Sequence, residues 1–295
     1  MHISVCICTY QRPALLARLL RHLRHQETGG LLAYSIVVAD NDRLESAKAV
    51  VAEFAANSAI RITYCSEPRQ NIALARNKAV ENAEGDFLAF IDDDEFPARD
   101  WLLSLHKACL KYNIDGVVGP VRRYFDEEPP KWIIEGKFYE RPTYETGFVI
   151  DWTKGRTNNL LIRKLIIEGD TQPFRPEFRT GEDQDFCRRM IEKGHLFIWN
   201  NEAVVYEVVP PKRWKRSFMV RRALLQGTAS TLHATGAFPI AKSLVAIPLY
   251  IVMLPAALLV GQHKFMALVI KLCDHIGRVF SRMHINLIKE PYVTA

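Results

Sequence analysis

Several features that define other protein classes are missing from this chain of 295 residues. No G-x-G-x-x-G motif follows the first predicted strand, which argues against a dinucleotide-dependent dehydrogenase. No glycine occurs between Thr9 and Leu20, where nucleotidyltransferases usually carry a glycine-rich, basic phosphate loop. The first residues contain neither a basic segment nor a long apolar run, so we expect no signal peptide.

Cysteine is sparse and follows no ligand or disulfide pattern. The spacing of the six cysteines matches neither a zinc site nor a disulfide framework: they are Cys6, Cys8, Cys65, Cys109, Cys187 and Cys273. Cys6 and Cys8 share one face of a predicted strand and are too close in sequence for an easy bridge. We therefore expect reduced core thiols in a protein from a reducing compartment.

Acidic residues are scarce in the last part of the chain. From Pro210 onward there are 12 Lys and Arg but 2 Asp and Glu, a net charge of +10, whereas the remainder carries a net charge of −4. A mildly acidic globular part with a basic, apolar tail favours an anionic membrane surface as a partner. It argues against nucleic acid, for which a basic patch with interleaved aromatic residues is expected on the globular part.

The tail contains one long uncharged stretch, Ser243–Gln262, which is 20 residues long and is interrupted by Pro248 and Pro255. That length just spans a bilayer. The two prolines and the basic flanks also suit a re-entrant or interfacial segment, and a buried core helix is the third interpretation. Residues 264–280 continue as an amphipathic helical pattern.

The acidic stretch Phe90–Pro97 is the most informative part of the sequence. The apolar run before it predicts a buried parallel strand, and Asp92, Asp93 and Asp94 begin where that strand ends. Adjacent carboxylates repel one another, so they need a cation or full hydration. On an extended backbone, Asp92 and Asp94 point to one side and can hold one divalent ion through oxygen. The alternative is a solvated acidic turn that caps a helix beginning near Pro97.

Strands and helices alternate over the first part of the chain. Expected strands are residues 3–9, 32–39, 60–65, 85–91 and 116–119, and expected helices are 13–23, 46–54, 70–83 and 97–112. This order favours an α/β fold with a mostly parallel, doubly wound sheet flanked by helices.

The pattern is lost between residues 122 and 151, which are irregular and rich in Pro, Trp and Tyr. This segment forms either loops that cover the core or, with Trp152 and Asn158, a surface for a carbohydrate acceptor. Further along, we expect an extended segment at 157–163, a helix at 180–193 with Thr180 as a cap, and short strands at 196–199 and 203–206.

Acidic pairs occur at three places: Asp40 and Asp42, Asp92 and Asp94, and Glu182 and Asp183. In a parallel sheet the first two pairs lie at the same edge, where open α/β sheets bind ligands. One pair can read a base or ribose while the other holds a metal ion on phosphates. The third pair, far away in sequence, can supply a general base.

The order and spacing of these segments resemble the family 2 glycosyltransferases, which bind nucleotide sugars with a Rossmann-like GT-A fold. The resemblance covers roughly residues 1–230 and depends on Val5–Pro13, Val37–Asp42, Ala75–Asn77, Asp92–Asp94 and Gly181–Asp183. It points to bacterial, non-processive enzymes that build exopolysaccharide repeat units on a lipid carrier, such as the succinoglycan glucosyltransferases. The Gln-x-x-Arg-Trp signature of processive enzymes is absent, because Arg213-Trp214 lacks the preceding Gln.

The resemblance implies a role for each candidate residue. The nucleotide site of a UDP-sugar would contain Thr9, Tyr10 and Arg12 around the uracil ring, Asp40 as acceptor of a hydrogen bond from it, and Asp42, Arg76, Asp92 and Asp93. Asp94 would hold Mn²⁺ or Mg²⁺ on the diphosphate. Asp183 would be the general base of an inverting transfer, with Glu182 supporting it or the acceptor.

Two departures from the family pattern affect these roles. The second acidic position beside Asp40 is Ala39 here, so the nucleotide contacts depend on Asp40 alone or with Asp42. Many relatives carry a His after the late strand as a metal ligand, and the matching residue here is Glu207. A carboxylate at that position can still bind a hard ion.

The expected organisation is a catalytic domain at residues 1–209, with a nucleotide-sugar half at about 1–120 and an acceptor half at about 121–209, followed by a membrane-associated helical tail at 210–295. Arg216, Arg221 and Arg222 either bind the diphosphate of a lipid-linked acceptor or flank a membrane segment. The expected location is the cytoplasmic face of the inner membrane, either at the surface or with one transmembrane segment.

Two other functions remain open from the sequence. A metal-dependent nucleotidyltransferase also places acids at strand ends, but it does not need an aspartate base at a helix start. A membrane-tethered module that senses a sugar nucleotide would use Asp40 and Asp94 and leave Asp183 idle. Release of UDP in the presence of an acceptor distinguishes both from a glycosyltransferase.

Overall fold

The computed structural model describes residues 1–178, 181–230, 238–283, 285, 287 and 288. The chain forms two compact units. The first contains Met1–Arg123 and Arg141–Val208, and the second contains Tyr124–Glu140 and Val209–Ala295. Residues 124–140, which the sequence places in the acceptor half of the first domain, therefore group with the C-terminal part of the chain. Thr180, the expected helix cap, lies outside the described residues.

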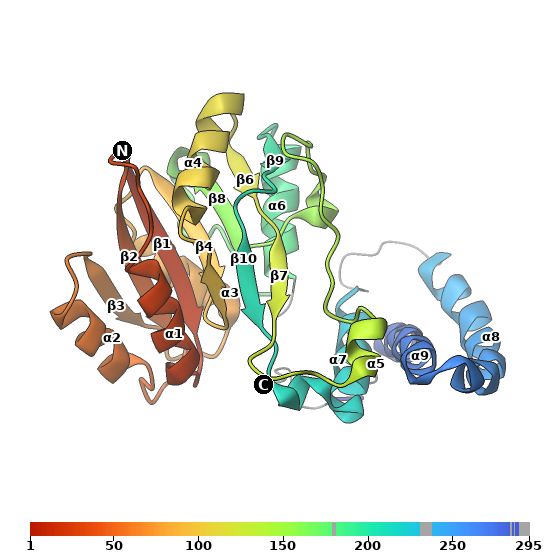
Figure 1. Ribbon diagram of the computed structural model, residues 1–295. Coiled ribbons are helices and arrows are strands. Elements are labelled where there is room, and N and C mark those ends of the chain that lie inside the picture. Colours follow the sequence, from red (N-terminus) through yellow and green to blue (C-terminus); the bar gives the residue numbers. More distant parts are fainter. Residues whose placement is uncertain (179–180, 231–237, 284, 286, 289–295) are drawn as a thin grey trace. The chain divides into compact units, whose positions relative to one another are not determined.

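A seven-stranded sheet forms the centre of the first unit (Figure 1). Its order is β3(Ile62–Ser66), β2(Ala33–Asp40), β1(His2–Thr9), β4(Phe87–Asp92), β8(Asn159–Arg163), β6(Gly116–Val118) and β9(Phe197–Trp199). The first four of these strands pair with one another in parallel, which confirms the predicted parallel core. Strand β8 is antiparallel to both β4 and β6. The start of β8 therefore lies at the same edge as the carboxyl end of β4.

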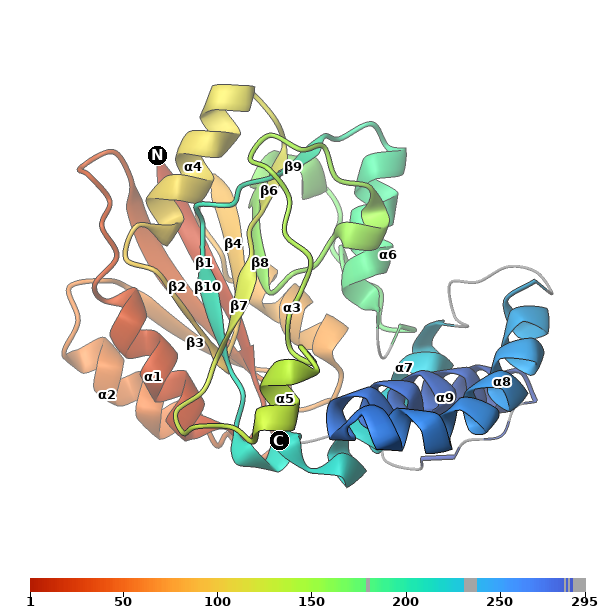
Figure 2. The same ribbon diagram turned by 45° about the vertical axis from the view of Figure 1, so that its right-hand side comes forward.

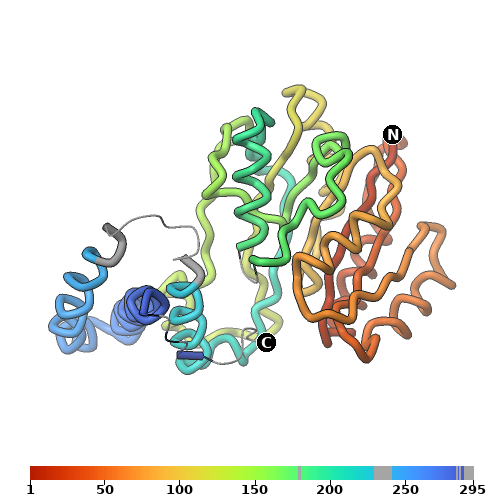
Figure 3. Tube along the Cα trace, turned by 180° about the vertical axis from the view of Figure 1, so that it is seen from behind, coloured from red at the N-terminus to blue at the C-terminus, as the bar shows by residue number. Residues whose placement is uncertain are grey.

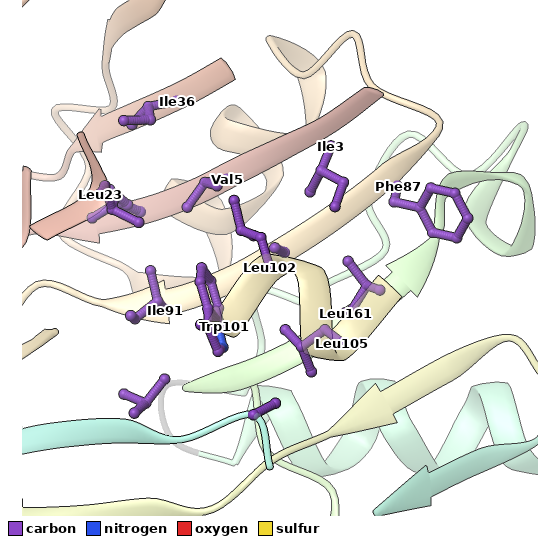
Figure 4. Packing of buried hydrophobic residues seen from close by; sticks show 14 of the residues in the cluster. Ile3, Val5, Leu23, Ile36, Phe87, Ile91, Trp101, Leu102, Leu105 and Leu161 are labelled. Atoms are coloured by element: carbon purple, nitrogen blue, oxygen red, sulfur yellow. The ribbon is translucent and has the colours of Figure 1, made fainter. Parts of the chain in front are cut away.

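Helices cover both faces of this sheet because successive strand residues point to opposite sides. One face carries Ile3, Val5 and Ile7 of β1 and packs against α1(Pro13–Leu23), α2(Lys48–Ala56) and α4(Trp101–Tyr112). Figure 4 shows Trp101, Leu102 and Leu105 of α4 against strand residues of this layer. The other face packs against α3(Ile72–Glu81) and α6(Glu182–Glu192), on the side turned toward the viewer in Figure 3.

The sequence predicts that a helix begins directly after the acidic stretch, near Pro97. The structure has a short strand there instead. The chain turns at Asp93–Asp94, and Glu95–Pro97 forms a short strand, β5, before α4 begins at Trp101. Strand β5 pairs antiparallel with β10(Val205–Val208) in a second sheet of order β5–β10–β7, in which β7 is Val121–Tyr124. Pro97 is tolerated in β5 because the strand lies at the edge of this sheet.

Helices of the second unit pack around α9(Gln262–Arg282), which contacts both α7(Arg216–Ser230) and α8(Phe238–Val260), as Figure 2 shows. A Cβ on Gly227 of α7 would meet the backbone of α9, and one on Gly277 of α9 would meet the backbone of α7. These two glycines allow the helices to approach closely. An aromatic cluster around α5(Lys131–Glu135) and the 3-10 helix Pro211–Trp214 packs on the first turns of α9.

Helix α8 exposes most of its apolar side chains. The window Ala241–Val260 has a mean hydropathy of 2.4, and 6% of it is buried. Its length and composition are sufficient for crossing a membrane. The interpretation as a buried core helix does not hold in this structure, because Val252 is 76% exposed and Leu259 is 90% exposed.

Candidate active site

The turn after β4 directs its three aspartates to different partners. The expectation that Asp92 and Asp94 alternate on an extended backbone is wrong, because residues 93 and 94 form the turn itself. The Oγ1 atom of Thr9, at the end of β1, donates to Asp93 Oδ2 at 2.7 Å. The Arg12 Nη1 atom lies 3.1 Å from Asp93 Oδ1 and 3.4 Å from Asp94 Oδ2. The predicted nucleotide residues Thr9 and Arg12 therefore meet the acidic turn directly.

Asp92 points to a different cation, Arg76 on α3. The Arg76 Nη2 atom lies 3.7 Å from Asp92 Oδ1, and Nη1 forms an ion pair with Glu182 Oε1 at the start of α6. Arg76 and Glu182 are buried, whereas 43% of the Asp92 side chain is exposed. One guanidinium thus pairs with carboxylates from two acidic segments that are far apart in the sequence. One side of the Asp92 carboxylate stays accessible to a ligand.

Asp183 lies in the same acidic cluster. Although part of its side chain is exposed, partial burial raises the pKa of Asp92 to about 6 in spite of the opposing charge of Arg76, and the negative charges of Asp94 and Asp183 add to the rise. Asp183 is half-buried in the first turn of α6, and its Oδ1 accepts a hydrogen bond from the backbone N–H of Gln184 at 2.8 Å. The structure therefore brings Asp183 close enough to Asp92 for their charges to interact.

Asp185, two residues further along α6, has a different role. It is fully buried, and its carboxylate accepts hydrogen bonds from Arg188 at 3.0 Å and from Arg189 at 2.8 Å. These two guanidinium partners, a third at 3.9 Å from Arg175, and the lack of exposed surface make it a structural anchor of the helix. Asp183, by contrast, forms no ion pair with any residue that the structure describes, and it is partly open to solvent.

Asp40 holds together the loop that follows β2. Its Oδ2 accepts from the backbone N–H of Ala47 at 2.8 Å and from the hydroxyl of Tyr64 at 3.1 Å, and its Oδ1 accepts from the N–H of Asp42 at 3.1 Å. The carboxylate has no exposed surface, and burial raises its pKa. Asp42 is buried too and accepts from the Gln11 amide at 3.4 Å, which links this loop to the turn after β1.

No pattern in the sequence assigns a role to Glu95 or Arg141, although both lie in the cluster. Glu95 is 2% exposed and accepts from the Asp92 backbone N–H at 3.1 Å and from the Asn158 amide at 3.0 Å. Burial, together with the charges of its acidic neighbours, raises the pKa of Glu95 well above its usual value. Arg141 pairs with Glu207, with Nη2 and Oε2 2.5 Å apart. Glu95 was visible in the acidic stretch, whereas no local pattern marks Arg141.

The other predicted residues are less closely connected to this cluster. Asn158 is buried against Glu95 rather than placed on an open surface. Tyr10 is half-buried in the turn after β1, and Trp152 is half-buried in the 3-10 helix Trp152–Lys154 beside α6. Arg216, Arg221 and Arg222 are on α7 of the second unit.

The cluster contains carboxylate oxygens of the kind that bind a hard divalent ion, but they are not arranged as a complete set of ligands. Among the residues that the structure describes, no group of three His, Cys, Asp or Glu side chains is arranged to hold a metal ion. Asp94 and Glu207 lie on neighbouring backbone segments, since the Val208 N–H donates to the Asp94 carbonyl oxygen at 2.9 Å. The donor chemistry therefore fits Mg²⁺ or Mn²⁺, while Arg12 and Arg141 supply positive charge to the same carboxylates.

The sequence also matches a known protein family. The family described as Glycosyl transferase family 2 matches residues 4–169, which include β1, β2, β4 and the acidic turn. The chain belongs to glycosyl transferase family 2. As a member of this family it is a glycosyltransferase, and its α/β fold with a central sheet flanked by helices is the GT-A fold.

Two curated relatives illustrate the range of similarity. The chain is 34% identical over 230 residues to succinoglycan biosynthesis protein ExoM of Rhizobium meliloti (strain 1021), a match that covers 77% of this chain and 73% of that protein. It is 22% identical over 226 residues to glycosyltransferase AglE of Haloferax volcanii, covering 76% of this chain and 73% of that one.

Solved structures of other glycosyltransferases share the fold. Mannosyltransferase PcManGT from Pyrobaculum calidifontis, in complex with GDP-Man and Mn²⁺, superposes with a TM-score of 0.65 at 17% identity and covers 95% of this chain and 87% of that chain. S. aureus TarS 1–349 in complex with UDP-GlcNAc gives a TM-score of 0.57 at 16% identity and covers 95% of this chain and 73% of that chain. Another crystal structure of TarS 1–349 is matched over 64% of its chain.

Proposed function

We propose that this glycosyltransferase moves a hexose, with inversion, from a UDP-sugar such as UDP-glucose to a saccharide acceptor in the synthesis of an exopolysaccharide or another cell-surface glycan. The observation that carries the proposal is the Arg76 bridge between Asp92 and Glu182, with Asp183 beside it. Similarity to ExoM, whose name refers to succinoglycan biosynthesis, supports the pathway class. The TarS complex with UDP-GlcNAc supports a nucleotide-sugar donor.

The nucleotide would lie at the carboxyl edge of β1, β2 and β4. Thr9 and Arg12 hold the acidic turn, so they fix the wall of the site on which the ribose and diphosphate would rest. Tyr10, at the end of β1, supplies a ring near the base. Asp40 and Asp42 shape the loop after β2, and we assign to Asp40 the positioning of that loop because its carboxylate is already satisfied there.

Asp94 and Glu207 would hold Mn²⁺ or Mg²⁺. A divalent ion in such a site supplies positive charge to the leaving diphosphate. Asp92, with an exposed carboxylate oxygen beside Arg76, faces the donor side of the site. The PcManGT complex with Mn²⁺ supports a metal in a related fold.

Asp183 would act as the general base. It accepts the proton of an acceptor hydroxyl while that oxygen attacks the anomeric carbon from the face opposite the diphosphate. The new C–O bond forms as the bond to the diphosphate oxygen breaks, so one displacement inverts the anomeric configuration. Glu182, held by Arg76, fixes the first turn of α6 and with it the position of Asp183.

The acceptor would be a saccharide on a lipid diphosphate, at the cytoplasmic face of the inner membrane. The support is the exposed apolar surface of α8 and the run of six basic residues between Lys212 and Arg222. Trp152, beside α6, would border the acceptor sugar. Arg216, Arg221 and Arg222 would face phosphate groups, of the acceptor or of the lipid surface.

A variant pair tests the assignments of base and metal ligand. Asp183→Asn should reduce turnover by about 10²–10⁴-fold, because a general base typically contributes that much, while UDP binding survives. Asp94→Ala should instead abolish the metal dependence of UDP binding. Turnover is measured as UDP released from a panel of UDP-sugars with Mn²⁺ and acceptor, and UDP binding by calorimetry.

The exposed acid Glu53 on α2 provides a matched control, and Glu53→Gln should behave as the wild type. Full turnover in Asp183→Asn would show that another group takes the proton. Binding of UDP without any acceptor-dependent release would favour a non-catalytic binding module, and release of diphosphate from a nucleoside triphosphate would favour a nucleotidyltransferase.

A further inference from the structure

Arg141 is the least expected member of the acidic cluster. Its Nη2 atom lies 2.5 Å from Glu207 Oε2, and the partner residues are 66 positions apart in the sequence. The Glu207 side chain is 12% exposed and that of Arg141 is 35% exposed. The pair is therefore partly shielded from solvent, where a charged contact is stronger than on an open surface.

The surroundings of Glu207 explain why a cation is needed there. Glu207 on β10 lies directly opposite Glu95 on β5 in the antiparallel pair, and like charges in that position repel each other. Arg141 supplies positive charge to Glu207 at the point where Glu207 and Glu95 lie opposite each other.

A divalent ion at Glu207 would compete with this guanidinium. Two cations on one carboxylate repel each other, so an ion that takes Glu207 as a ligand must weaken or break its contact with Arg141. Arg141 lies in an irregular segment, because residues 140–145 form neither helix nor strand. The side chain can therefore turn away without disturbing a helix or a sheet.

We propose that Arg141 is a positioning residue that neutralises Glu207 before the donor binds and then exchanges this carboxylate for a phosphate oxygen of the nucleotide diphosphate. The proposal rests on the proposed function, since it needs a diphosphate and a divalent ion at this site. A guanidinium suits both partners, because its planar fork donates paired hydrogen bonds to carboxylate and to phosphate oxygens.

The exchange predicts opposite effects of one substitution on two ligands. In Arg141→Ala, the dissociation constant for Mn²⁺ alone should fall by about threefold or more, because no guanidinium competes for Glu207. The dissociation constant for UDP at saturating Mn²⁺ should rise by about tenfold, because a hydrogen bond from a charged donor to the diphosphate is lost. Arg141→Lys should bind Mn²⁺ like the wild type and UDP with intermediate affinity, since it keeps the charge but not the fork.

The experiment uses the full-length protein, with free Mn²⁺ followed by electron paramagnetic resonance and UDP binding by calorimetry. Arg99→Ala, at an exposed position after β5, is the matched control and should leave both constants unchanged. Circular dichroism and thermal melting verify that each variant is folded. These readouts do not depend on catalytic turnover.

The outcomes separate this proposal from the proposed function. Weaker Mn²⁺ binding in folded Arg141→Ala, or unchanged UDP binding, would overturn the exchange while leaving the donor site intact. Failure of the wild-type protein to bind UDP with Mn²⁺ would overturn the donor site itself, and the exchange with it. Tighter Mn²⁺ binding together with weaker UDP binding is the result that supports the exchange.

Discussion

At the scale of single residues, the candidate site contains more carboxylates than arginines, and the arginines stabilise the carboxylates. Arg76 is the most constrained of these cations, because it is 7% exposed and bridges Asp92 and Glu182. Breaking a buried ion pair costs more than the pair contributes, because the remaining partner keeps its charge without compensation. Arg76 therefore has a structural role at the contact of α3 with α6, and under the proposed function it also positions Asp183.

This dual role predicts a measurable loss of stability. Arg76→Met should reduce the free energy of unfolding by about 3–5 kcal/mol, because the buried Glu182 is left unpaired. The double variant Arg76→Met/Glu182→Leu should recover much of that loss, since both charges are then gone. Urea denaturation followed by circular dichroism measures both, and equal stability of the single and double variants would contradict the role of the pair.

Some residues of the candidate site can be predicted from the sequence, and others cannot. Asp92, Asp94 and Asp183 were predicted because each follows a predicted strand or opens a predicted helix. Arg141 was not predicted, because its segment has no hydrophobic period and its partner is 66 positions away. Asp40 was predicted as a ligand-facing residue, but nothing in the sequence shows that its carboxylate is occupied by the N–H groups of its own loop.

At the scale of elements, the parallel strands were predicted more accurately than the short antiparallel ones. Strands β1, β2 and β4 are apolar runs flanked by turns and are largely buried on both faces, so their pattern is local. Strand β5 has three residues and ends in Pro97, a composition that indicates a turn or a helix start. It becomes a strand because β10, distant in sequence, pairs with it.

Helix α3 illustrates how one cap fixes an element of the site. Asn71 accepts hydrogen bonds from the backbone N–H groups of Ala73 and Leu74, and its amide donates to the Pro176 carbonyl at 2.8 Å. Asn71→Ala should reduce the free energy of unfolding by about 1–2 kcal/mol through loss of the cap. Since α3 carries Arg76, UDP affinity should fall as well.

Asn71→Asp is the informative control for this cap. It keeps the acceptor for the N-terminal N–H groups but loses the donor to Pro176, so it should retain most of the stability. Chemical denaturation and calorimetry with UDP measure the two effects. Equal destabilisation by both substitutions would show that the contact with Pro176, rather than the cap, carries the stability.

At the scale of the whole molecule, the chain joins a unit that contains the candidate active site to a unit with an exposed apolar helix. The chain passes from the first unit to the second after Arg123, returns at Arg141 and leaves again after Val208. Arg141 and Glu207, which form an ion pair, thus stand at two of these three crossings. In the second unit, α8 presents apolar side chains that no described element of the chain buries.

This exposed surface predicts that the full-length protein binds membranes through α8. Val252→Asp together with Leu259→Asp should reduce binding to anionic lipid vesicles by at least about tenfold, because a charged side chain costs about 2.5–3.5 kcal/mol in the apolar part of a membrane. Both positions are largely exposed, so the substitutions should leave the fold intact. Vesicle sedimentation measures binding. Gln172→Asp, an exposed position in the first unit, controls for the added charge, and unchanged binding of the α8 variant would show that the basic residues of α7 alone hold the protein at the lipid surface.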